Sequence, residues 1–103
     1  MDKLNILVIG RHYEIMETVV RLLNSQSGWH AEGALNDREA LEKFSQTAFE
    51  CVLIGGGVEE ASERQLTSKI KKLRPQTRVI RHFGGGSGLL FNEIQMALER
   101  SEG

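Results

Sequence analysis

Two apolar runs stand out along the chain, at residues 4–9 and 49–54. Each contains a single polar residue, and glycine follows each of them, Gly10 after the first run and Gly55 after the second. A strand covered on both faces gives such a continuous run, whereas a strand with one solvated face alternates. We therefore predict two central strands of a parallel sheet at 4–9 and 49–54.

Two other segments, at 29–35 and 77–83, mix apolar with polar residues. The first carries His30 and Glu32, and the second has only Val79 and Ile80 as aliphatic residues. Edge strands tolerate polar and charged side chains because one of their sides faces solvent. We therefore predict that both segments are edge strands.

Helical periodicity fills the intervals between these strands. Apolar residues recur at helical spacing over 13–25, after Asn36, and over 60–73, where Pro75 forbids continuation. Capping-box patterns mark two helix starts, Asn36 with Glu39 and Ser62 with Gln65. A last helix, ending near residue 100, is predicted from the spacing of Leu90, Ile94, Ala97 and Leu98.

Strands and helices therefore alternate along the whole chain, from 1 to 103. Short connections and right-handed crossovers then require a parallel sheet with helices on both faces. With the first and third strands central, the predicted strand order is 2-1-3-4. We expect one α/β domain, a three-layer sandwich.

Composition narrows the possible functions. The 103 residues carry 13 Lys and Arg against 14 Asp and Glu, a net charge of −1, which makes nucleic-acid binding unlikely as a bulk electrostatic effect. The one cysteine, Cys51, lies in an apolar run, so neither a disulfide framework nor a cysteine zinc site is expected. No apolar stretch is long enough for a membrane span, and the start shows no signal-peptide layout, so we expect a cytoplasmic protein.

In this pattern, and in the phrases ILVI at 6–9 and ECVLI at 50–54, the chain resembles the CheY-like receiver domain of bacterial response regulators. The resemblance implies a flavodoxin-like fold. The strand at 77–83 leads through a glycine loop directly into the last helix, as though one helix and one strand of the receiver pattern were deleted. The lysine that receivers carry after a fifth strand therefore has no counterpart.

The resemblance also implies where phosphorylation residues would stand. Receivers carry an acidic pair after the first strand, a phosphorylated aspartate after the third and a hydroxyl residue after the fourth. The matching positions hold Gly10 and Arg11, then Gly55, then Phe83 or Gly84. Gly55 supplies no nucleophile, and Arg11 puts a positive charge where the divalent metal would sit, with no acid at the strand ends to offset it. This predicts a degenerate phosphoacceptor pocket with no metal, no cofactor and no enzymatic activity.

Other features leave alternatives open. Glycine-rich residues between a strand and a helix can cradle a phosphate or can serve only as a flexible turn, and the loop in question is Gly84, Gly85, Gly86, Ser87 and Gly88. His12 and His82 are predicted near the same sheet edge, but two histidines do not define a zinc site. Glu59 and Glu60 are expected to stabilise a helix amino terminus.

A block of six basic residues without an acid runs from Lys69 to Arg81. It fits a solvated helix end, since cations favour a helix carboxyl terminus, or else a docking surface for an acidic partner or nucleic acid.

The resulting hypothesis is a phosphorylation-independent pseudo-receiver, a protein-interaction module in bacterial signal transduction. The alternative is a domain that binds a phosphate-bearing metabolite or nucleotide at its glycine-rich loops. We expect a protein partner or a homodimer at the last strand and the start of the last helix, with the contact residues Arg78, Arg81, Phe83, Leu90 and Phe91.

Overall fold

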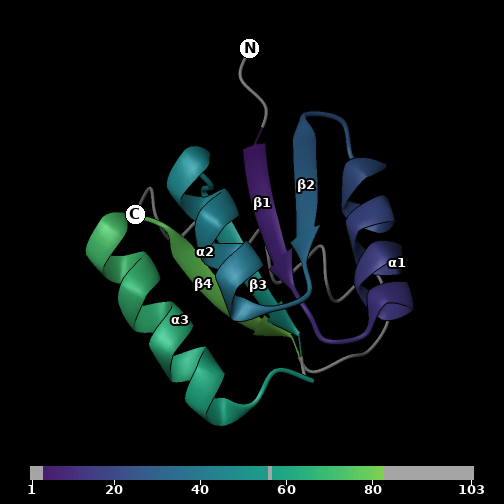
Figure 1. Cartoon of the computed structure of the whole chain (residues 1–103). Coiled ribbons are helices and arrows are strands. Elements are labelled where there is room, and N and C mark those ends of the chain that lie inside the picture. Colours follow the sequence, from purple (N-terminus) through teal and green to yellow (C-terminus); the bar gives the residue numbers. More distant parts are fainter. Residues whose placement is uncertain (1–3, 56, 83–103) are drawn as a thin grey trace.

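Strands and helices alternate in the structure as the sequence predicts. The computed structural model describes residues 4–55 and 57–82. Its elements in chain order are β1 (Leu4–Ile9), α1 (Tyr13–Asn24), β2 (Trp29–Ala34), α2 (Asp37–Gln46), β3 (Cys51–Gly55), α3 (Glu60–Leu73) and β4 (Arg78–His82) (Figure 1). The predicted last helix lies outside the described residues.

The four strands form one parallel sheet in the order β2-β1-β3-β4, which confirms the predicted topology. The central pairing sets Ile6 opposite Cys51 and Ile9 opposite Ile54. The last four residues of β1 and the first four of β3 are buried, and none is more than 3% exposed. The continuous apolar runs thus belong to the two central strands, as expected from their lack of alternation.

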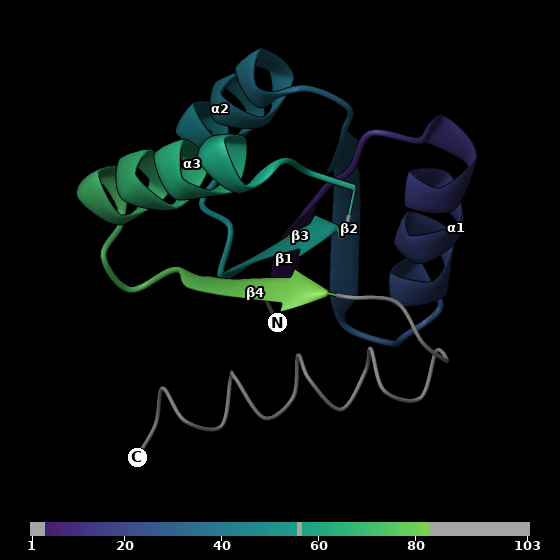
Figure 2. The same ribbon diagram turned by 90° about the horizontal axis from the view of Figure 1, so that it is seen from below.

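Helices cover both faces of the sheet (Figure 2). On one face, α2 and α3 pack Phe44, Leu66 and Ile70 against side chains from all four strands. On the other face, α1 packs Met16 and Leu23 against the alternate side chains of the same strands. A Cβ added at Gly33 would overlap Met16 Sδ, so glycine in β2 lets α1 approach the sheet closely.

The two predicted capping boxes have different outcomes. Asn36 is the N-cap of α2, where its Oδ1 accepts from the Glu39 amide at 2.8 Å, and Glu39 Oε1 in turn accepts from the Leu35 amide at 2.9 Å. The predicted cap at Ser62 is wrong, because α3 begins two residues earlier, after the N-cap Glu59. Val58 is buried and its amide donates to the Gly55 carbonyl at 3.2 Å, so this tight turn sets the start of α3.

Side chains form hydrogen bonds with the backbone along the outer edge of β2. The Ala31 amide donates to Asn24 Oδ1 at 2.8 Å, and Asn24 Nδ2 donates to the Ala31 carbonyl at 3.2 Å. Lys43 Nζ donates to the Gly33 carbonyl at 2.7 Å. The amide of Asn24 therefore takes the place of a neighbouring strand at Ala31, and with Lys43 on the Gly33 carbonyl it obstructs further pairing at this edge.

No helix in the described part of the chain is both long enough and apolar enough to cross a bilayer.

Candidate functional site

The carboxyl ends of β1 and β3 lie side by side, and ligands of open α/β sheets bind at such a junction. Gly10 follows β1, and its amide donates to the Ala34 carbonyl at 3.0 Å, while Gly55 ends β3. A Cβ at Gly55 would lie 3.2 Å from the Ile9 carbonyl oxygen, a tight approach that favours glycine here. The two positions thus bring backbone, and no side chain, to the junction.

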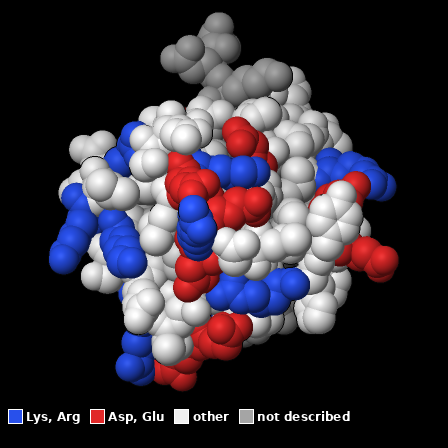
Figure 3. Space-filling model, in the orientation of Figure 1, with Lys and Arg blue, Asp and Glu red and all other residues white. Residues whose placement is uncertain are grey.

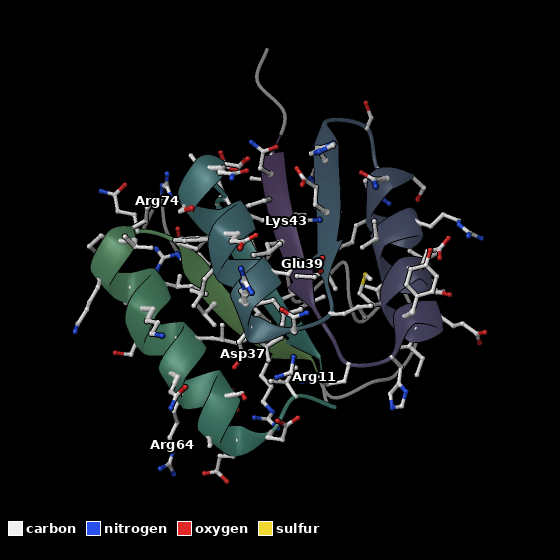
Figure 4. The ribbon with its side chains drawn as sticks, viewed as in Figure 1. Arg11, Asp37, Glu39, Lys43, Arg64 and Arg74 are labelled. Carbon is white, nitrogen blue, oxygen red and sulfur yellow. The ribbon has the colours of Figure 1, made fainter. Side chains whose placement is uncertain are left out.

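The side chain that fills this edge is Arg11. Its Nη2 donates to Asp37 Oδ1 at 2.7 Å and its Nε donates to Glu59 Oε1 at 3.2 Å. Its Nη1 donates to the Leu35 carbonyl at 3.3 Å. One guanidinium therefore ties the loop after β1 to the end of β2, the start of α2 and the start of α3 (Figure 4).

Charges balance locally around this guanidinium. Burial lowers the pKa of Arg11, but the hydrogen bonds and charges of Asp37 and Glu59 outweigh that effect, so the net pKa is raised and the cation is permanent. Asp37 is the first residue of α2 and Glu59 is the N-cap of α3. Both carboxylates also gain from the positive end of a helix dipole.

The sequence predicts no acid at the ends of the first and third strands, and it does not predict these two partners of Arg11. Acids are indeed missing at the ends of β1 and β3, but those that pair with Arg11 come from the starts of the following helices. Glu59 stands at a helix amino terminus, as expected, and it also accepts a hydrogen bond from Arg11. The signal that sequence reasoning missed is Asp37, an acid that follows an edge strand by three residues and so reaches the same edge.

A metal centre is not assembled in residues 4–55 and 57–82, where no group of three or more His, Cys, Asp or Glu side chains is placed to hold an ion. His12 is exposed at the N-cap of α1 and makes no side-chain cap bond there. Cys51 is buried, and burial, with a smaller effect of Glu50, raises the pKa of its thiol to about 12. A thiol of that pKa is a poor nucleophile near neutral pH.

The basic block is less solvated than the sequence suggests. Arg81 forms an ion pair with Glu63 on α3, and Lys71 Nζ donates to the Thr77 carbonyl at 2.5 Å. Arg74 Nη1 donates to the Phe44 carbonyl at 2.7 Å, and its guanidinium lies 5.1 Å from the Phe44 ring centroid. These three cations hold α3 against β4 and α2, whereas Lys69 and Lys72 are exposed as expected.

Phe83, the loop Gly84–Gly88, Leu90 and Phe91 lie outside the described residues. The side chain of His82 also lies outside the described part, although its backbone ends β4. Of the predicted pocket, the structure brings together Gly10, Arg11 and Gly55.

The fold is similar to that of solved receiver domains. A CheY-like response regulator receiver domain protein from Methanospirillum hungatei superposes with a TM-score of 0.80 at 18% identity, over 98% of each chain. A response regulator receiver domain protein from Clostridium thermocellum gives 0.69 at 26% identity, over 93% of this chain and 75% of that one. TrrA of Thermotoga maritima, a response regulator solved with Mg²⁺ and BeF, gives 0.73 at 17% identity, over 95% and 98%. No protein-family model matches the sequence, and no curated protein matches it.

Proposed function

We propose that this receiver-like domain acts through protein contacts and is not switched by phosphorylation. Its receiver fold suggests a role in two-component signalling. The observation that carries the proposal is the guanidinium of Arg11, which directly follows Gly10 in the chain and is bonded to Asp37 and Glu59.

Aspartyl phosphorylation makes demands that these residues do not meet. It needs a carboxylate nucleophile and oxygen ligands for Mg²⁺. Gly55 has no side chain, and the Asp37 carboxylate that reaches this edge already accepts a 2.7 Å bond from Arg11. The residues at the edge therefore do not fit a magnesium ion, because the fixed cation there would repel it.

Incubation with acetyl phosphate and Mg²⁺, or with beryllofluoride and Mg²⁺, tests the proposal. We expect no phosphoryl mass on the intact protein and no amide shifts at Gly10 or Gly55 in NMR spectra, while a competent receiver in the same mixture is modified. A saturable response that depends on Mg²⁺ would overturn the proposal.

A single substitution should not restore the chemistry. Gly55→Asp supplies a carboxylate, but Arg11 remains and no acid follows β1, so we expect no phosphorylation of this variant. Its Cβ would also crowd the Ile9 carbonyl.

The contact surface that we propose includes the outer edge of β4, with Arg78 and Arg81. Homodimerisation through this edge is one form of the proposal. The backbone groups and charges that β4 exposes determine which kind of partner can bind there.

A further inference from the structure

The outer edge of β4 is open in the described part of the chain. The Arg78 amide donates to the Glu50 carbonyl at 3.0 Å, so Arg78 turns its backbone groups toward β3. Backbone direction alternates along a strand, and Val79 therefore turns its N–H and C=O outward. Neither group has a partner among residues 4–55 and 57–82, in contrast to the bonded edge of β2.

A groove adjoins the start of this edge. Its volume is about 860 Å³, and its lining includes Ala48, Glu50, Leu73, Pro75, Thr77 and Arg78. Leu73, at the end of α3, is 57% exposed and so presents apolar surface to the groove. The groove thus offers apolar surface beside unpaired backbone groups, and extended peptides use both when they add to a sheet.

The charged side chains that line the groove are Arg74, Arg78 and Glu50, so the lining carries a net positive charge. Arg78 has no ion pair in the described part of the chain, and its Nε is buried without a hydrogen bond. Glu50, the acid in the groove, instead accepts from the Asn5 amide at 2.6 Å. Blue atoms also gather at the left edge of Figure 3, where α3 lies.

We propose that the edge of β4 and the adjoining groove bind an extended acidic segment of a partner protein. The segment pairs its main chain with Val79, places a carboxylate on Arg78 and packs an apolar side chain beside Leu73. This inference rests on the proposed function, since it names the partner of a domain that acts through protein contacts.

A second copy of the chain suits this edge less well. Pairing two β4 strands would bring together two segments that each carry Arg78 and Arg81, and like charges across strands are destabilising. An acidic strand meets the same guanidinium with the opposite charge, and charge-assisted hydrogen bonds to a carboxylate are among the stronger ones.

Fluorescence anisotropy with the full chain tests the inference. The probe is a short labelled peptide in which Glu alternates with Val, and the control peptide carries Lys in place of Glu. We expect saturable binding of the first only, with a shift of the Val79 amide signal. Arg78→Glu should weaken binding about tenfold or more, the loss expected for a charge pair worth at least 1.4 kcal/mol.

Two controls keep the test independent of folding. Lys72→Glu makes the same charge change on α3 away from the lining of the groove, and it should weaken binding much less. The second control uses the wild-type protein and two N-methylated forms of the acidic peptide, each methylated at one of the two sets of alternate amides. One form should lose binding, because the main-chain donors that pair with β4 are removed, and the other should keep it.

Four outcomes would overturn the inference: no binding of the acidic peptide, equal binding of the lysine peptide, tighter binding of single-stranded nucleic acid, or a homodimer whose contacts include Val79. An amide of Val79 protected from exchange in the free protein would also overturn it, since the edge would then be covered already. Each can occur while the protein stays inert to acetyl phosphate, so failure here is distinct from failure of the proposed function.

Discussion

Replacing Arg11 with methionine should destabilise the fold by about 2 kcal/mol. The pair with Asp37 joins side chains that are only 22% and 32% exposed, so it contributes about 1 kcal/mol, the upper part of the range for accessible ion pairs. Glu59 is 66% exposed and its pair adds about 0.3 kcal/mol. The remainder comes from the Leu35 carbonyl, which loses its bond.

Urea unfolding measures this loss. For a domain of this size we expect a slope of about 1–2 kcal/mol per molar, so the midpoint should fall by roughly 1–2 M without a change in slope. A double-mutant cycle with Asp37→Asn should give a coupling energy of about 1 kcal/mol, and a cycle with Glu59→Gln a smaller one.

The matched control is Arg38→Met, because Arg38 forms an i,i+4 pair with Glu42 in which the two side chains are 89% and 61% exposed. It should cost at most about 0.5 kcal/mol. If Arg11→Met costs no more than this control, or if Arg11 and Asp37 show no coupling, then the guanidinium does not brace the carboxyl edge and the reasoning fails.

Three further predictions concern the rest of the domain. Amide exchange should be slowest in β1 and β3, and the Ala31 amide should exchange more slowly than that of Val79; slowest exchange in 77–82 would contradict the open edge. Native Cys51 should resist iodoacetamide at pH 8, and since its pKa rises from 9.0 unfolded to about 12 folded, stability should fall as pH rises above 9, less so in Cys51→Ala; rapid labelling would contradict its burial. Arg74→Met should cost about 1–2 kcal/mol in urea unfolding, against little for Lys72→Met, and equal costs would show that the contact with Phe44 contributes nothing.

The arrangement of the strands follows directly from sequence pattern. Runs such as 4–9 and 49–54 can be buried on both faces only at the centre of a sheet, and chain connectivity leaves one order for the remaining strands. The bounds of α3 were predicted correctly, but its cap was not. Ser62 with Gln65 has the right spacing, yet burial of Val58 in a tight turn fixes the helix start before Ser62 is reached.

The site was predictable only in part. Gly10, Arg11 and Gly55 are found at the carboxyl edge because parallel strands end together, which spacing alone reveals. The partners of Arg11 are not revealed in this way, since Asp37 and Glu59 stand 26 and 48 residues away and meet it only through the register of three strands. The basic block shows the same limit, because the roles of Arg74 and Arg81 depend on which helix packs behind β4.

The bonded edge of β2 has a consequence for how copies of this domain can assemble. A parallel sheet with two open edges can grow from both sides, and identical chains can then add without end. Asn24 and Lys43 remove one of those sides. Even if two copies paired through β4 instead of binding a partner, both ends of the joined sheet would be β2 strands, so association through strand pairing would stop at two chains and could not propagate into a fibre.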